Sequence, residues 1–305
     1  MIVVVCPGQG SQTPGFLTPW LELEGARERL DAYADAAQVD LRAAGTEWDA
    51  DRIRDTSVAQ PLIVAASLLS WHALTADGLR PAGVAGHSVG ELAAVAAAGV
   101  VGDRAAMTIV GARGRAMAEA AAQDETGMSA VVGGVEEQVL DAIAAQGLEP
   151  ANYNGGGQIV AAGATAGLAA LAENAPRGAR VIPLQVAGAF HTRYMAPAKD
   201  ALRAAVDAAA GAVADPEVLL WSNSDGQPVD TGARALDLIV QQVASPVRWD
   251  LCMASFADHG VTGIIELAPA GALVGLAKRG LKGVPAVAVK TPDDLEAARD
   301  LLAAA

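Results

Sequence analysis

The 305-residue sequence has few cysteines, few aromatic residues and a deficit of positive charge. Its two cysteines, Cys6 and Cys252, are too few and too far apart for a disulfide framework or a zinc cluster. We expect both to be buried thiols in a reducing cytoplasm. Aromatic residues make up only 4% of the chain, whereas hydrophobic residues make up 52%. A core of this composition must be built mainly from alanine, valine and leucine.

Lysine and arginine number 21 against 35 aspartates and glutamates, a formal net charge of -14. This balance argues against a general nucleic-acid or anionic-membrane binder, because either partner would be repelled over most of the surface. Any acidic partner would need a local basic patch. Residues 1–6 are too short and lack the basic flank of a signal peptide, and no later stretch is expected to reach membrane-spanning length. We expect a soluble, cytoplasmic monomer.

The order of the predicted strands and helices indicates an α/β protein. Residues 2–6 are a continuous apolar, valine-rich run that ends at Pro7-Gly8, which is typical of a strand buried on both faces of a parallel sheet. Further along, the pattern changes to β-α-β-β-α-β, the ferredoxin-like order. We therefore predict one α/β body formed by residues 1–126 and 190–305, with a ferredoxin-like subdomain inserted at 127–189.

The stretch Gly86-His-Ser-Val-Gly90 places one hydroxyl between two glycines, ahead of an alanine-rich run. It matches the nucleophile elbow, in which small residues permit a sharp turn that projects the serine above a sheet. A strand is expected before Ser88 and a helix after it, so a developing oxyanion or an acyl ester would lie at the positive end of the helix dipole. The alternative is a serine cap in an ordinary glycine-rich turn.

A serine nucleophile needs a base within hydrogen-bond reach, and four histidines are available. His87 is adjacent to Ser88, where neighbouring side chains diverge, and His72 lies in a predicted helix where a structural role is expected. His259 precedes a glycine at a predicted helix end and would cap its dipole. His191 lies where the small subdomain returns to the body, a place from which it could overhang a cleft. This position favours His191 as the base for Ser88.

Two further features need an explanation. The first loop, Pro7-Gly-Gln-Gly-Ser-Gln12, fails the dinucleotide fingerprint because Thr13 stands where the third glycine would fall. It could instead supply a backbone N–H to an oxyanion hole together with Val89; a plain tight turn is the alternative.

Arg113 borders the apolar face of a predicted helix, unlike Arg115. Arg113 therefore needs an anion, either an internal carboxylate or the carboxylate of a bound ligand.

Together these motifs resemble those of the malonyl-CoA:acyl-carrier-protein transacylases, the acyltransferases of fatty-acid and polyketide synthesis. The resemblance spans almost the whole chain, and its family fold is a hydrolase-like α/β body with a ferredoxin-like insertion. The blocks that carry it are Pro7-Gly-Gln-Gly-Ser-Gln12, Ala59-Gln-Pro61, Gly86-His-Ser-Val-Gly-Glu91, Arg113-Gly-Arg-Ala-Met117, Asn152-Tyr-Asn154 with Gly157-Gln-Ile159, Gly188-Ala-Phe-His191, Gln242 with Ser245-Pro-Val-Arg-Trp249, and Glu266-Leu-Ala-Pro269.

The resemblance implies a catalytic dyad. Ser88 would be the nucleophile that takes the malonyl group, and His191 the base that activates first this serine and later the carrier thiol. The backbone carbonyl of Gln242 would orient His191 in place of a triad aspartate. A carbonyl can hold the imidazole tautomer without a third ionisable side chain, which fits the lack of a convincing acidic partner in the sequence.

The resemblance also implies the residues that bind the substrate. The guanidinium of Arg113 would pair with the free malonyl carboxylate, and Gln9 and Val89 would offer backbone N–H groups to the oxyanion. Phe190 resembles the malonyl type at the position before the histidine, where a ring leaves little room for a branching methyl group. A hydrophobic pocket discriminates one methyl group by only about 1 to 3 kcal/mol, so we expect strong but incomplete selectivity.

The implied reaction is a ping-pong transfer from malonyl-CoA to the phosphopantetheine thiol of an acyl carrier protein, with no metal and no bound cofactor. The acidic carrier could dock on Lys278, Arg279 and Lys282, or on Arg177 and Arg180, although scattered solvated charges are the alternative for both clusters.

Two other functions stay open: a serine thioesterase or esterase, in which water completes the reaction, and a non-catalytic carrier-binding scaffold. Arg113, which is expected to point inward, argues against the thioesterase or esterase, because a neutral acyl chain would not need a buried positive charge.

Overall fold

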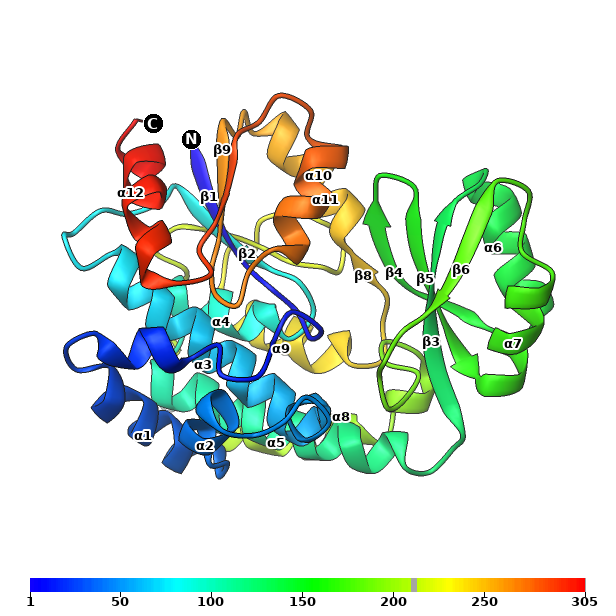
Figure 1. The fold of residues 1–305 in the computed structure, drawn as a ribbon, viewed down its shortest axis with the longest axis horizontal. Helices are drawn as coiled ribbons and strands as arrows, with labels where there is room; N and C mark the ends of the chain where they lie inside the picture. Colours follow the sequence, from blue (N-terminus) through cyan, green and yellow to red (C-terminus); the bar gives the residue numbers. More distant parts are fainter. Residues whose placement is uncertain (210–212, 305) are drawn as a thin grey trace.

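The computed structural model describes residues 1–209 and 213–304, and residues 210–212 and 305 of the predicted body lie outside the described part. Two bodies, each built on its own sheet, lie side by side (Figure 1). The larger sheet is entirely parallel, in the order β10-β9-β1-β2-β7. Its strands are β1 (Ile2–Cys6), β2 (Gly83–Gly86), β7 (Leu219–Trp221), β9 (Gly263–Glu266) and β10 (Ala286–Ala288). The predicted α/β class with a parallel sheet is confirmed.

Helices cover both faces of this sheet, because successive strand residues point to opposite sides. In β1, Ile2, Val4 and Cys6 enter one core. Val3 and Val5 enter the other. Helices around the first core are α1 (Ala26–Ala37), α2 (Leu41–Thr46), α3 (Thr56–Leu74), α4 (Gly90–Ala97), α5 (Asp103–Ala121), α8 (Ala198–Ala209), α9 (Gly232–Gln242) and α12 (Leu295–Ala303). Helices around the second are α10 (Trp249–Asp258) and α11 (Ala272–Gly280). Short 3-10 turns occur at η1 (Thr18–Glu22), η2 (Arg52–Arg54), η3 (Arg193–Met195) and η4 (Pro292–Asp294).

The smaller body follows the β-α-β-β-α-β order. Its elements are β3 (Thr126–Gly133), α6 (Glu136–Ala145), β4 (Glu149–Gly155), β5 (Gln158–Ala164), α7 (Thr165–Glu173) and β6 (Ala179–Pro183). The four strands are antiparallel in the order β6-β3-β5-β4, and α6 and α7 share a small core with the sheet. A fifth strand, β8 (Val247–Arg248), pairs parallel with β4 although it comes from the chain after α9. Two residues are too short a run to predict as a strand.

Helix α3 corrects one expectation from the sequence. It is 19 residues long with a mean hydropathy of 1.3 in its most apolar 18-residue window, so by length and composition it could cross a membrane. The expectation that no later stretch reaches this length was therefore wrong. However, 78% of that window is buried inside the protein. The core helix of an α/β protein is apolar all round when other elements surround it, and this accounts for the composition.

Glu266 ends β9 and fixes the start of α11. Its carboxylate accepts hydrogen bonds from the backbone N–H groups of Gly271 at 2.8 Å, Leu273 at 3.0 Å and Val274 at 2.8 Å. The side chain is fully buried. The first N–H groups of a helix have no partner within the helix, so this carboxylate satisfies donors that would otherwise be unpaired. It also places the face of α11 that lines the cavity described below.

Replacing Glu266 by alanine is expected to lower the free energy of unfolding by about 3 kcal/mol, because three backbone donors lose their acceptor. Urea unfolding of both proteins measures the difference. The matched control is Glu296→Ala, an exposed glutamate of α12, which should change stability by less than about 0.5 kcal/mol. Equal midpoints for Glu266→Ala and the unchanged protein would contradict this role.

Candidate active site

Ser88 lies in a sharp turn between β2 and α4. Its φ of 53° is in the left-handed region, which a non-glycine residue adopts only when its surroundings enforce it. The flanking residues Gly86 and Gly90 must be glycine because other backbone atoms approach them too closely to leave room for a side chain. A Cβ on Gly86 would overlap the backbone of Gly90, and a Cβ on Gly90 would overlap the carbonyl oxygen of Cys6. The serine is thus held in the strained geometry that the elbow pattern predicts, and not in an ordinary capping turn.

The turn brings the serine hydroxyl against His191. The Oγ atom of Ser88 lies 2.7 Å from Nε2 of His191, and the other ring nitrogen, Nδ1, lies 2.8 Å from the backbone oxygen of Gln242. A carbonyl oxygen only accepts, so Nδ1 carries the proton and donates it to Gln242. That leaves the lone pair of Nε2 facing the serine. His191 also has a positive φ of 63°, and its backbone N–H donates to the oxygen of Val243 at 3.1 Å.

The imidazole is buried and uncharged. His191 is 4% exposed, and burial, followed by the positive charge of Arg113, lowers its pKa to about 3. Near neutral pH the ring is therefore in the form that accepts a proton. The dyad has the geometry and the protonation state that general-base activation of a hydroxyl requires.

Arg113 points inward from α5 and is 1% exposed. Its Nη1 donates to Oε1 of Gln60 at 2.6 Å, and its Nη2 donates to Oε1 of Gln242 at 2.8 Å. Both acceptors are neutral amides. Burial lowers the pKa of Arg113 to about 10, which still leaves it charged at neutral pH. The charge therefore lies beside the dyad without a carboxylate in direct contact, and its Nε has no partner among the described residues.

Gln9 and Val89 come from two different segments, the loop after β1 and the turn that carries Ser88. Gln9 is in the loop after β1, where its side chain donates to the carbonyl of Arg54 at 3.3 Å. Val89 is the N-cap residue of α4 and is buried. Within residues 1–209 and 213–304, neither backbone N–H has a hydrogen-bond acceptor. Two free donors at this position could bind an oxyanion.

A cavity of about 390 Å³ opens over the dyad between the two bodies. Ser88 and His191 line it, as do Gln9 and Phe190, and the small sheet contributes residues of β3, β4 and β5. Its volume suits a small acyl group with part of its carrier. Arg113 does not line this cavity; it contacts the side chain of Gln242, and its charge acts on His191, which does line the cavity.

A family model described as "Acyl transferase domain" matches residues 3–296. The chain belongs to the acyl transferase domain family. It is 52% identical over 299 residues to the malonyl CoA-acyl carrier protein transacylase of Mycobacterium tuberculosis, covering 97% of this chain and 98% of that one. The resemblance inferred from the sequence motifs is confirmed.

Solved structures of relatives have the same fold. The crystal structure of the Mycobacterium tuberculosis protein superimposes with a TM-score of 0.94 at 52% identity, covering 99% of each chain. A malonyl-transacylase solved in complex with a type II PKS acyl-carrier protein superimposes with a TM-score of 0.91 at 29% identity. That match covers 98% of this chain and 99% of the other.

Several residues of the candidate site were not predicted from the sequence. Asn223 follows β7, and its Oδ1 accepts from the backbone N–H of Ser88 at 2.8 Å while its Nδ2 donates to the carbonyl of Gly86 at 2.7 Å. The available signal was the polar run Ser222-Asn-Ser-Asp225 directly after a strand, since the carboxyl ends of parallel strands meet at one edge of the sheet. Glu91, the last residue of the motif Gly86-His-Ser-Val-Gly-Glu91, is buried beside Asn223.

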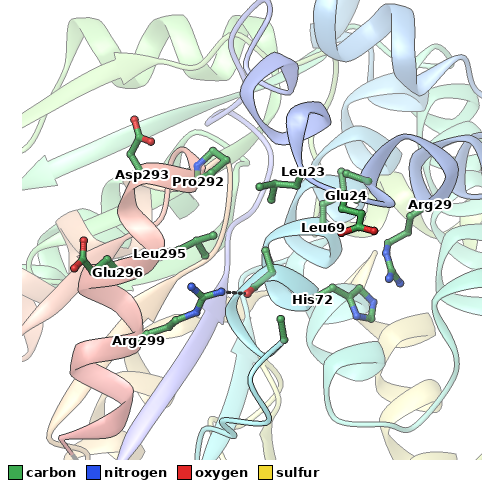
Figure 2. A pocket seen from close by; sticks show the side chains of 13 residues that line it. Leu23, Glu24, Arg29, Leu69, His72, Pro292, Asp293, Leu295, Glu296 and Arg299 are labelled. Carbon is green, nitrogen blue, oxygen red and sulfur yellow. Dashed lines mark hydrogen bonds between the residues drawn. The ribbon is translucent and has the colours of Figure 1, made fainter.

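The remaining histidines have other partners. His87 lines the cavity, where its Nε2 lies 2.8 Å from Oδ1 of Asn154. His72 Nε2 lies 2.6 Å from Oδ2 of Asp103, and His259 is the C-cap residue of α10. A second, larger cavity of about 820 Å³ is lined by His72 and by residues near α1 and α12. Figure 2 shows the side chains that line it. Neither Ser88 nor His191 lines it, so the larger of these two cavities is not the one at the candidate site.

Across the described residues, no group of three or more His, Cys, Asp or Glu side chains is placed to hold a metal ion.

Proposed function

We propose that this chain is a malonyl-CoA:acyl-carrier-protein S-malonyltransferase, which moves a malonyl group through a Ser88 ester to the phosphopantetheine thiol of an acyl carrier protein. The observation that carries the proposal is the 2.7 Å contact between Ser88 Oγ and the neutral Nε2 of His191, with the buried charge of Arg113 beside it. The relatives named malonyl CoA-acyl carrier protein transacylases support it. The relative solved with a carrier protein supports the choice of partner.

Acylation begins with proton transfer from Ser88 to His191 Nε2 as Oγ attacks the thioester carbonyl of malonyl-CoA. The carbonyl oxygen becomes an oxyanion, which the backbone N–H groups of Gln9 and Val89 stabilise. Collapse of this intermediate breaks the carbon–sulfur bond and releases the CoA thiol, to which the proton on His191 passes. The product is a malonyl ester of Ser88.

Transfer to the carrier reverses the same chemistry. His191 takes the proton of the phosphopantetheine thiol, whose sulfur attacks the ester carbonyl. The serine leaves and recovers its proton, so the enzyme is regenerated with no cofactor consumed. We propose that Lys278, Arg279 and Lys282 dock the acidic carrier, because they lie at the end of α11 and Arg279 lines the cavity of Ser88.

The guanidinium of Arg113 is proposed to bind the free carboxylate of the malonyl group. Two of its five donors contact amide oxygens, so three N–H groups are left for an anion. Phe190 lines the cavity beside His191 and is proposed to limit the space at the acyl α-carbon. In this assignment residues 1–126 and 190–305 form the catalytic body, and residues 127–189 an inserted subdomain that supplies the opposite wall.

Incubation with labelled malonyl-CoA tests the proposal. We expect one modified peptide, containing Ser88, and its label should pass to an added phosphopantetheinylated acyl carrier protein much faster than to water. Rapid loss of the label to water instead would indicate a thioesterase. The absence of any acyl-enzyme would indicate a carrier-binding scaffold and contradict the proposal.

Replacing Arg113 by alanine is expected to lower the rate of malonyl loading by about 10- to 100-fold, because a charge-assisted contact with the carboxylate is lost. Loading of acetyl-CoA, which has no free carboxylate, should change far less. Stopped-flow or quench measurements of both acyl-enzymes give the ratio. Arg115→Ala is the matched control, since Arg115 lies on the same helix and donates to the backbone oxygen of Ala37. An unchanged ratio in Arg113→Ala would contradict the carboxylate site.

A further inference from the structure

The side chain and backbone of Gln242 join the three parts of the proposed site. Its carbonyl accepts from Nδ1 of His191 at 2.8 Å, and its Oε1 accepts from Nη2 of Arg113 at 2.8 Å. Its Nε2 donates to the backbone oxygen of Ser88 at 3.0 Å and to Oε2 of Glu91 at 2.5 Å. One residue therefore contacts the base, the cation and the backbone of the nucleophile.

An amide side chain can turn over and exchange its oxygen with its nitrogen, so something must set its orientation. Arg113 only donates, and it requires the oxygen of Gln242. Glu91 only accepts when ionised, and it requires the nitrogen. Glu91 is 3% exposed, and its other oxygen accepts from the backbone N–H of Asn223. Both carboxylate oxygens are thus in use, and the one that meets Gln242 acts together with the backbone oxygen of Ser88 to hold the amide in a single orientation.

We propose that Glu91 is a positioning residue for the acyl group: through the Gln242 amide, its carboxylate orients the guanidinium of Arg113 toward an acyl-CoA that carries a free carboxylate. This inference rests on the proposed function and extends it to a residue that does not touch the substrate. Loss of the carboxylate would leave the backbone oxygen of Ser88 at 3.0 Å and Oδ1 of Asn223 at 3.4 Å as the acceptors that keep Nε2 turned away from Arg113, so the amide would turn over more easily. A donor facing a donor would displace the guanidinium. Loading of an acyl group that carries a free carboxylate would then slow more than loading of a neutral acyl group.

The surroundings of Glu91 make its charge sensitive to pH. Arg113 from α5 and Cys252 from α10 are the titratable groups that face it among the described residues, and Gln242, Ser222 and Asn223 are its neutral polar neighbours. Burial raises the pKa of the Cys252 thiol well above its usual value, so that group is uncharged. Burial raises the pKa of Glu91 to about 7 against the opposing hydrogen bonds. Below this pH the carboxyl gains an O–H, and the oxygen that carries it becomes a weaker acceptor for the N–H group of Gln242 or Asn223.

The substitution Glu91→Gln keeps the size of the side chain but leaves only one oxygen for two donors. We expect the ratio of malonyl loading to acetyl loading to fall about tenfold, while acetyl loading itself changes by a smaller factor. Asp103→Asn is the matched control. It removes a partly buried carboxylate at the other end of the helix that carries Arg113, where Asp103 pairs with His72. Its ratio should equal that of the unchanged protein. An equal ratio in Glu91→Gln would overturn the proposal.

The unchanged protein supplies a second test that does not depend on the variant folding. Between pH 8 and about pH 6 the malonyl-to-acetyl ratio should fall as Glu91 takes up a proton, and Glu91→Gln should show a low and flat ratio over the same range. A flat ratio in the unchanged protein would overturn the proposal. Failure of the proposed function is a separate result, because the unchanged protein would then form no malonyl ester on Ser88 at any pH.

Discussion

Ser88→Ala is expected to form no acyl-enzyme and to transfer malonyl groups at least about 10⁴-fold more slowly than the unchanged protein. The substitution removes the only atom that forms a covalent bond to the acyl group in the proposed mechanism. It leaves the oxyanion donors and the buried arginine in place, so substrate binding should persist. Mass spectrometry after incubation with labelled malonyl-CoA, together with carrier malonylation rates, measures both effects.

No neighbouring nucleophile is expected to replace the serine. Cys252 is near the turn, with its sulfur 3.8 Å from Nδ2 of Asn223, but it is buried and its raised pKa keeps it a thiol and not a thiolate. Ser224→Ala is the matched control, because this exposed serine follows the same strand edge and has no proposed role. Label on the Ser88→Ala protein at any other residue would contradict the assigned nucleophile.

His191→Ala is expected to slow acylation about 10³-fold, because the serine would lose the base that takes its proton. Substrate affinity should change much less than the rate constant, since the imidazole is proposed to act on the serine and the thiols. Single-turnover measurements separate the two quantities. His72→Ala, in a helix away from the dyad cavity, is the matched control and should keep full acylation rates.

The pH profile gives an independent check on His191. Its pKa is lowered to about 3, so the imidazole is neutral at every higher pH, and base function is lost only as the pH falls through about 3. We expect acetyl loading to lack an acid limb near pH 6.5, the ordinary pKa of histidine. An acid limb at that value for acetyl loading would contradict the buried, uncharged base. A fall in malonyl loading alone near pH 7 would instead reflect Glu91 when the Glu91→Gln protein lacks it.

The charge of Arg113 connects substrate choice to this base. After burial, it is the next largest cause of the lowered pKa of His191. A carboxylate bound to Arg113 would offset that positive charge and raise the pKa of His191 toward its usual range. The base would then be stronger when an anionic acyl group is bound than when a neutral one is, which adds selectivity to the rate of acylation.

Local pattern was enough to predict most of the fold. The apolar run of residues 2–6 predicts a strand buried on both faces, and β1 is such a strand. The glycines around Ser88 predict a strained turn, and the structure has one. The β-α-β-β-α-β order appears between residues 126 and 183. Each of these features depends on residues close together in the chain, whose spacing and backbone preferences are written directly in the sequence.

Contacts between distant segments were decided only by the tertiary structure. Asn223 holds the backbone of Ser88 from 135 residues away, and Glu91 meets the Gln242 amide across 151 residues. For Arg113 the sequence left a choice between an internal and a bound carboxylate, whereas the folded chain gives it two amide oxygens. Side-chain chemistry shows what a residue can bind, but which partner it meets depends on how helices and strands pack. That packing is set by the summed burial of many residues, and no local spacing encodes it.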